Sequence, residues 1–368
     1  MRHSFARAAL VLLCFAGHCT ATPSARKLIS GEASKVEPGE YPNVVKIILN
    51  FGEQNGGRVQ RNFCTGTLIS PGAILTAAHC MEQPGGVLLY KDILGENEQH
   101  LASYVVFPGK TEKIYIQNWW LHPWYTSGML DISFHDDIAV LGLYKCIKDT
   151  VPVTLSQSDN LACKAGETVG YGATNGAGEF YDPTHKQTGI LETKIARKTT
   201  LRIHSAKTCD QIHNHFFQQA FKSNNQDLIN EVMKMHGPEL YRHYRDFYGD
   251  DMSGLERGRM NSAMLRRIDQ QINYLSSDFC VTPTTDSFQQ NRNGDSGAPI
   301  FVDGKQVGVF SSYLYISRGI LAKYGMVSSH LGWIKGVVQK LNDCGVPKTL
   351  SVLKRRLSFP MMMPRRKL

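Results

Sequence analysis

Three residues of this sequence have types and positions that could act together on an acyl group. His79 ends an apolar run, Asp137 directly precedes another, and Ser296 lies in a glycine-rich turn. A serine hydroxyl is unreactive at neutral pH unless a neighbouring base takes its proton, and an imidazole, which titrates at about pH 6.5, suits that task. An acid that fixes the histidine tautomer completes the set. The three residues therefore predict acyl transfer through a nucleophilic serine.

Asp136 is the alternative to Asp137 as the acid. We favour Asp137 because it directly precedes the apolar run and should be the more buried of the two. Taken singly, each residue of the set also fits a capped turn or a solvated polar group. It is their combination and order that indicate chemistry.

The chain resembles a chymotrypsin-like serine protease of the trypsin family. The resemblance is carried by Thr-Ala-Ala-His-Cys at 76–80, Asp-Ile-Ala-Val-Leu at 137–141 and Gly-Asp-Ser-Gly-Ala-Pro at 294–299, which follow the family's order of His, Asp and Ser. Supporting marks are Cys64, sixteen residues before Cys80, His122-Pro123, Gly170-Tyr171-Gly172 where members usually have Gly-Trp-Gly, and Trp333-Ile334. The match covers about residues 28–341, apart from an insertion.

The resemblance implies a role for each residue of the set. His79 would be the general base and acid, Asp137 the orienting carboxylate and Ser296 the nucleophile. The backbone N–H groups of Gly294 and Ser296 would form the oxyanion hole, in a turn that glycine permits. The implied fold is all-β, with two packed six-stranded antiparallel β-barrels and a C-terminal helix.

Activation by cleavage is also implied. Family members are made inactive and cut at a basic residue, and the new α-amino group pairs with the Asp before the nucleophile. Here Arg26-Lys27 precedes a Leu-Ile-Ser-Gly sequence that resembles the family's Ile-Val-Gly-Gly, with Leu28 and Ser30 as departures. We expect cleavage after Lys27 and pairing of the Leu28 amine with Asp295. The alternative is that the basic pair is only a solvated surface feature.

The substrate pocket departs from the pattern of the family's Arg/Lys-cleaving members. Gln290 stands where those members carry an Asp. Tyr313, where small-residue members have Gly, could narrow the pocket entrance, and Ala322 resembles a position that is Gly in open pockets. Ser311 begins the segment that normally pairs with the substrate backbone. Because an uncharged pocket base gives a buried cation no partner, we expect no strong preference for Arg or Lys. The alternative is that a local insertion moves Asp286 into the pocket.

The pattern of apolar residues along the chain predicts the elements that must position these residues. Short runs rich in Val, Ile, Leu and Tyr, separated by Gly and Pro, predict an antiparallel sandwich or barrel. The runs are 43–49, 66–75, 104–107, 138–143, 168–171, 299–301 and 306–315. Residues 210–279 differ, because apolar residues there recur at helical spacing. We predict an α-helical insertion there, which is a lid, a partner-binding surface or inert decoration.

The ends of the chain have their own character. Residues 1–21 predict an export signal, 22–27 a short activation propeptide, 28–344 the protease domain and 345–368 a flexible basic tail. Residues 1–27 carry four basic and no acidic residues, and residues 345–368 carry seven basic and no acidic residues. Without these eleven positive charges, the net charge of +9 for the whole chain becomes −2 for residues 28–344. This distribution argues against a nucleic-acid partner for the folded body. No segment is long and apolar enough to predict a transmembrane span.

Nine cysteines fit an oxidising compartment. Cleavage of the export signal would remove Cys14 and Cys19 and leave an odd number of cysteines. The resemblance implies bridges Cys64–Cys80 and Cys209–Cys280, and it leaves open the pairing of Cys146, Cys163 and Cys344. No CxxC pair occurs, and His213 and His215 lack a third ligand at a fitting spacing, so we expect no metal site and no cofactor.

These observations predict a secreted serine endopeptidase, made as a zymogen and acting on proteins or peptides. An activating protease is an implied partner, and a further partner at 210–279 is possible. The alternative is a protease-like, non-catalytic binding protein that acts through the insertion. The intact catalytic set favours the enzyme.

Overall fold

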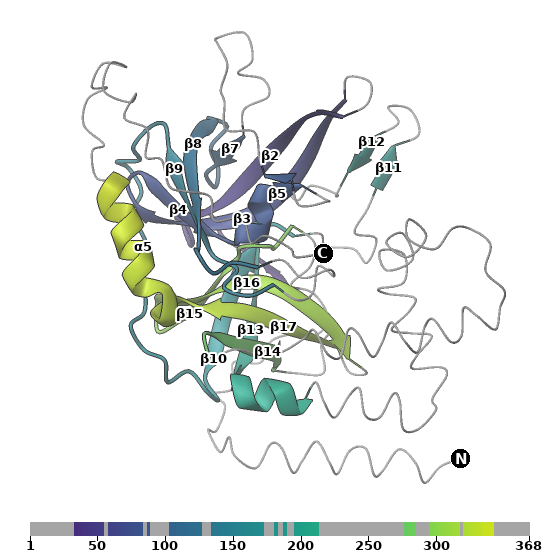
Figure 1. Cartoon of the computed structure of the whole chain (residues 1–368), viewed down its shortest axis with the longest axis vertical. Coiled ribbons are helices and arrows are strands. Elements are labelled where there is room, and N and C mark those ends of the chain that lie inside the picture. The colour runs from purple at the N-terminus through teal and green to yellow at the C-terminus, as the bar shows by residue number, and fades with distance from the viewer. Residues whose placement is uncertain are drawn as a thin grey trace, which may run out of the picture.

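The computed structural model describes residues 33–54, 58–83, 87–88, 103–126, 134–172, 180–182, 187–189, 195–212, 276–284, 294–316 and 319–341. These residues form two β-barrels, one after the other along the chain, and a C-terminal helix (Figure 1). The first barrel is drawn in purple to blue, and the second in teal to yellow-green below it.

The first barrel is closed by six strands in the order β2-β3-β4-β9-β8-β7. They are β2 (Val44–Gln54), β3 (Arg58–Ser70), β4 (Ala73–Thr76), β7 (Tyr104–Val106), β8 (Ile114–Leu121) and β9 (Ala139–Leu143). All residues of β4 and β9 are buried, as expected for strands that read as continuous apolar runs. The single strand predicted over 66–75 is wrong: a turn at Pro71 and Gly72 divides it into the end of β3 and all of β4.

The second barrel is built from a seven-stranded sheet in the order β1-β13-β10-β15-β16-β17-β14. The strands are β1 (Ser34–Lys35), β10 (Ala165–Gly170), β13 (Arg197–Ser205), β14 (Asp278–Pro283), β15 (Pro299–Val302), β16 (Lys305–Ile316) and β17 (Gly319–Met326). An additional pairing of β13 with β14 closes six of them into a ring and leaves β1 at the edge. In its core the buried rings of Phe279 and Tyr324 are stacked, and the Phe310 ring packs against Tyr324 at a tilt.

The described residues also contain several short elements. They are the 3-10 helix η1 (Ala78–Met81), the strand pair β5 (Glu82–Gln83) and β6 (Val87–Leu88), and the strand pair β11 (Phe180–Asp182) and β12 (Gln187–Gly189).

The C-terminal helix α5 (Val327–Leu341) joins the two barrels. It begins directly after β17 of the second barrel, yet its buried residues Val327, Ile334 and Val337 belong to the hydrophobic core of the first. The predicted all-β fold with two six-stranded barrels and a C-terminal helix is confirmed. None of the helices in the described residues is long and apolar enough to cross a membrane.

Two disulfides tie the described elements together. Cys64 of β3 bonds Cys80 of η1, and Cys209 bonds Cys280 of β14. Residues 206–212, directly after β13, are helical, and the second bridge joins this helical start to the strand where the described chain resumes. Most of the insertion predicted over 210–279 lies outside the described residues, as do the predicted signal, propeptide and basic tail.

His204 gives the second barrel a predictable response to acid. Burial, with a smaller contribution from the charge of Arg202, lowers the pKa of His204 to about 4, and its Nε2 lies 2.8 Å from the Thr282 hydroxyl. In the unfolded chain a histidine titrates at about pH 6.5. Between these values the unfolded chain therefore binds a proton that the folded chain does not, so stability should fall as pH drops from about 6.5 to about 4.

His204→Gln removes this titration while keeping a side chain that can reach Thr282. We expect its melting temperature to decline less than that of the unmodified protein over the same pH range, as followed by scanning calorimetry. Parallel declines in the two proteins would contradict the assignment.

Candidate active site

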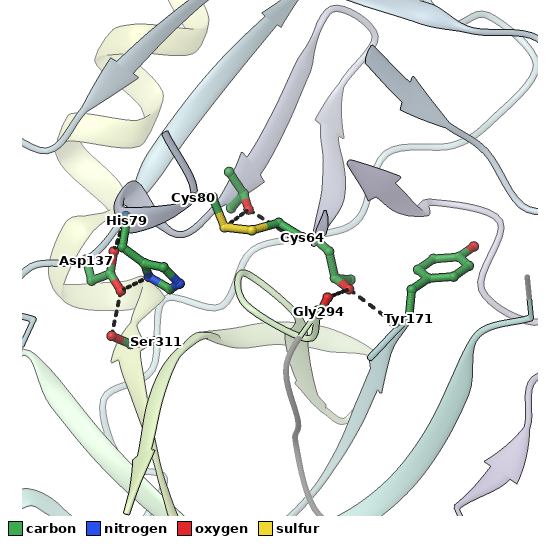
Figure 2. Close-up of a disulfide and its surroundings, with 9 residues drawn as sticks. Cys64, His79, Cys80, Asp137, Tyr171, Gly294 and Ser311 are labelled. Atoms are coloured by element: carbon green, nitrogen blue, oxygen red, sulfur yellow. Dashed lines mark hydrogen bonds and ion pairs between the residues drawn. A yellow bond between two sulfur atoms is a disulfide. The ribbon is translucent and has the colours of Figure 1, made fainter. Parts of the chain in front are cut away.

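His79 and Asp137 lie against each other where η1 meets the start of β9 (Figure 2). His79 Nδ1 is 2.7 Å from Asp137 Oδ2, and the His79 backbone N–H donates to Asp137 Oδ1 at 2.8 Å. Because an ionised carboxylate only accepts hydrogen bonds, Nδ1 carries the ring proton and Nε2 carries the lone pair. The side chain of His79 is 17% exposed and that of Asp137 is 2% exposed. The imidazole is therefore oriented by a buried acid, as a general base requires.

A third donor comes from the second barrel. The Ser311 hydroxyl, on β16, donates to Asp137 Oδ2 at 2.6 Å. Burial raises the pKa of the Asp137 carboxyl, but the positive charge that His79 carries when protonated and the hydrogen bonds from His79 and Ser311 together lower it more. The net result is a pKa below the ordinary value, so this carboxylate is ionised at neutral pH.

Asp136, the alternative acid, faces a different partner. Its Oδ1 lies 2.8 Å from His330 Nε2 on α5, and Ser277 Oγ donates to it at 3.4 Å. Asp136 has a positive φ of 46°, which turns the two neighbouring carboxylates apart. Asp137 is also the more buried, at 2% against 8%. In the structure it is Asp137 that holds His79.

The turn that carries Ser296 needs glycine on both sides. Gly294 and Gly297 have φ values of 94° and 80°, a region that favours glycine. A Cβ on Gly297 would lie 2.0 Å from Thr76 Oγ1 and 2.3 Å from the Thr65 carbonyl oxygen. The first barrel thus approaches the backbone of this turn more closely than any side chain at position 297 would allow.

Thr65, on β3, fixes the same turn through two hydrogen bonds and makes a third with Tyr171. Its N–H donates to the Ser296 carbonyl at 2.8 Å, and its hydroxyl donates to the Gly294 carbonyl at 3.0 Å. The same hydroxyl accepts from the N–H of Tyr171 at 3.1 Å. Figure 2 shows Thr65's neighbour Cys64, with Gly294 and Tyr171 close below it. The backbone whose N–H groups would form the oxyanion hole is therefore set from the first barrel.

Asp295 occupies a notch between two glycines. The N–H of Gly172 donates to Asp295 Oδ1 at 2.7 Å. A Cβ on Gly170 would lie 2.0 Å from that oxygen, and one on Gly172 would lie 2.4 Å from the carboxyl carbon. This close approach explains the glycines around Tyr171. Leu28, the predicted partner of Asp295, lies outside the described residues.

The predicted substrate pocket is described only in part. Ser311 and Ala322 are buried, and Tyr313 on β16 is paired across the sheet with Ala322 on β17. The Tyr313 ring stacks on that of Phe310, with centroids 6.3 Å apart. Gln290, like its alternative Asp286, lies outside the described residues.

The disulfides bear on the site directly. The Cys64–Cys80 bridge joins the neighbour of Thr65 to the neighbour of His79, so a covalent link connects His79 to the strand that holds the Ser296 turn (Figure 2). Cys146 and Cys163 also form disulfides. Cys344 lies outside the described residues.

Two features escaped the sequence analysis. One is Thr65, which follows Cys64 without any local signal of its role. The other is a buried cluster of His122, Asp136 and His330, whose ligand atoms lie within 4.8 Å of one another. The His122-Pro123 and Trp333-Ile334 pairs marked these segments as part of the resemblance, but nothing in their spacing indicated that they meet.

A model of the trypsin family matches residues 16–230. This chain belongs to the trypsin family. It is 26% identical over 200 residues to a trypsin of Saccharopolyspora erythraea, a match that spans 52% of this chain and 71% of the relative. The family is one of serine-protease hydrolases.

Solved structures resemble the trypsin-family fold of this chain. A structure of the scabies mite inactivated protease paralogue S-D1 has a TM-score of 0.50 and 14% identity, covering 85% of this chain and 98% of that one. A structure described as GrC has a TM-score of 0.49 and 17% identity, covering 83% and 98%. The likeness to the mite protein shows the fold alone.

The role of Thr65 can be tested by stability. Thr65→Val keeps the shape of this fully buried side chain but leaves the Gly294 carbonyl and the Tyr171 N–H without its hydroxyl. We expect a loss of about 1–3 kcal/mol in the free energy of unfolding, measured by denaturant titration. Thr67 supplies a matched control on the same strand, because its buried hydroxyl has no hydrogen-bond partner among the described residues. Thr67→Val should cost nothing, and equal losses in the two variants would refute the role of Thr65.

Proposed function

We propose that this protein is a secreted serine endopeptidase that hydrolyses peptide bonds through an acyl-enzyme on Ser296. The observation that carries the proposal is the contact of His79 Nδ1 with Asp137 Oδ2 at 2.7 Å, reinforced by the Ser311 hydroxyl on the same oxygen. A buried carboxylate that fixes one tautomer of an imidazole is a feature that general-base catalysis needs and that a surface for binding alone does not.

The proposed reaction has two halves. The Ser296 Oγ attacks the carbonyl carbon of the scissile peptide bond while His79 Nε2 takes the hydroxyl proton. The N–H groups of Gly294 and Ser296 stabilise the oxyanion, and His79 then gives the proton to the leaving amine as the C–N bond breaks. In the second half, water loses a proton to His79 and attacks the acyl carbon, and that proton returns to Ser296 Oγ as the ester bond breaks.

We propose that activation is cleavage after Lys27. The carboxylate of Asp295, directly before the nucleophile, is held in the notch at Gly170 and Gly172. Pairing of the new Leu28 amine with this carboxylate would place an ion pair next to the oxyanion turn and stabilise its conformation. The rival interpretation, that Arg26 and Lys27 are only solvated, predicts full activity without cleavage.

Secretion is part of the proposal. The disulfides of the described residues fit an oxidising compartment, and the predicted signal at 1–21 would direct export. The substrates would be proteins or peptides, an activating protease would cut at Lys27, and the insertion at 210–279 could dock a partner.

The second candidate is a protease-like protein that binds without catalysis, through the insertion. It is favoured by the size of that insertion and by Arg292, which stands where the family usually has a cysteine whose disulfide braces the pocket. A non-catalytic binding protein should not react at Ser296 with a reagent that modifies catalytic serines.

Labelling by a fluorophosphonate distinguishes the two functions. We expect a single covalent label on Ser296 after cleavage at Lys27, little label before it, and none in Ser296→Ala, measured by in-gel fluorescence and peptide mass spectrometry. A correctly cut and folded sample that takes up no label would exclude the enzyme. Equal labelling before and after cleavage would exclude only the activation step.

The pocket makes a separate prediction about specificity. Because the side chains of Tyr313 and Ala322 lie on paired strands where open pockets have glycine, we expect the activated protein to prefer small uncharged residues before the scissile bond over Arg, Lys or Phe. Tyr313→Gly should raise kcat/KM for a Phe substrate relative to an Ala substrate by about tenfold or more. The exposed Tyr144, changed to Ala, should leave the ratio unaltered. A preference of the unmodified protein for Arg before the scissile bond would contradict this prediction.

A further inference from the structure

Behind the catalytic residues, three elements bring metal-ligating side chains together. His122 directly follows β8, Asp136 lies shortly before β9, and His330 lies in the first turns of α5. Their ligand atoms all lie within 4.8 Å of one another, and His330 Nε2 is 2.8 Å from Asp136 Oδ1. His122 and His330 are buried, while the Asp136 side chain is 12% exposed, which leaves solvent a route to the cluster.

His330 is oriented as a metal-binding histidine would be. Its Nδ1 is 2.7 Å from the Met326 carbonyl oxygen, one helical turn earlier. Because a carbonyl only accepts, Nδ1 carries a proton and Nε2 is the nitrogen that faces the cluster. Donation of the other ring N–H to a backbone carbonyl is the usual way in which a protein fixes the tautomer and direction of a metal-ligating histidine.

His122 supplies a second, independent observation. Its Nδ1 is buried and has no hydrogen-bond partner among the described residues. Its ring meets the His330 ring edge to face, with centroids 4.8 Å apart, and its backbone N–H donates to the Ile138 carbonyl at 2.9 Å. A buried polar nitrogen that lacks a partner needs an explanation, and beside His330 and Asp136 a bound metal ion is one.

We propose that His122, Asp136 and His330 form a binding site for a divalent transition-metal ion of the zinc type. Two imidazoles and one carboxylate are a common zinc donor set, and water would complete a four-coordinate site. Calcium and magnesium do not suit it, because they require mostly oxygen ligands. On binding, the metal ion replaces the proton between His330 Nε2 and Asp136 Oδ1, and that proton passes to solvent.

The site would act on structure rather than on the chemistry of hydrolysis. The metal would join the end of β8, the residue before Asp137 and α5, which packs on the first barrel. A ligand that binds only the folded chain raises its stability. The proposal does not rest on the proposed function, since binding requires neither Ser296 nor cleavage at Lys27.

The test is zinc binding by the full chain. The secreted protein, stripped with a chelator, is titrated with zinc chloride by calorimetry, and its metal content after dialysis is measured by mass spectrometry. We expect one zinc per chain and a rise in melting temperature. Cobalt chloride in place of zinc should give the visible absorption of a four-coordinate nitrogen and oxygen site.

Two variants and one control locate the ion. Asp136→Asn keeps a residue that tolerates the positive φ at this position, so the fold should be retained while zinc affinity falls by about tenfold or more. His122→Gln should lower the affinity at least as much. His135 is a matched control, because its Nδ1 is also buried without a partner among the described residues yet lies outside the cluster.

The outcomes are decisive in both directions. Retained binding in His135→Gln with loss in the two cluster variants supports the site. The proposal is overturned if the stripped protein takes up no zinc, if both cluster variants bind as the parent does, or if only His135→Gln loses the ion. Should a cluster variant fail to fold, the cobalt spectrum of the parent decides, because a site without imidazole and carboxylate ligands would leave the octahedral spectrum of hydrated cobalt.

Discussion

An ionised carboxylate almost wholly removed from water is the constraint on which the rest of this structure depends. Burial of a charge costs several kcal/mol unless hydrogen-bond donors surround it, and Asp137 receives the N–H and ring of His79 from η1 and the hydroxyl of Ser311 from β16. Because these donors come from different barrels, the carboxylate is satisfied only when the barrels meet in one arrangement. The contact that would orient a base for catalysis is therefore also a contact that sets the junction of the two barrels.

The turn of Ser296 is placed by a second set of links that starts on the other side of His79. Cys80 follows His79 and is bonded to Cys64, and the next residue, Thr65, holds the carbonyls of Gly294 and Ser296. A path of covalent bonds and two hydrogen bonds thus runs from the histidine to the serine turn without leaving the buried interior. Since such interiors are close-packed, a shift at one end is transmitted to the other.

Much of this arrangement could be predicted from sequence, because the decisive signals are local. The residues around His79, Asp137 and Ser296 lie in short stretches whose order carries the family resemblance, and the choice of Asp137 over Asp136 agrees with their burial. The division of 66–75 into two strands was missed although the sequence carries a local turn signal there, Ser70-Pro71-Gly72, between its two apolar halves. The links made by Thr65 were missed for a different reason: they join residues more than a hundred positions apart, and only the tertiary fold decides which side chains of two distant strands face each other.

The two neighbouring carboxylates show how a remote element could reach the proposed active site. The positive φ of Asp136 turns its side chain toward His330 on α5 while Asp137 faces His79, so each acid has its own imidazole. The Ile138 N–H donates to the Asp136 carbonyl at 2.8 Å, and the Ile138 carbonyl accepts from the His122 N–H, so the backbone on both sides of Asp137 is fixed. Any change in how α5 holds Asp136 must then act on the residue that orients the base. The C-terminal helix is in this sense part of the site, because it holds the residue that precedes the acid facing His79.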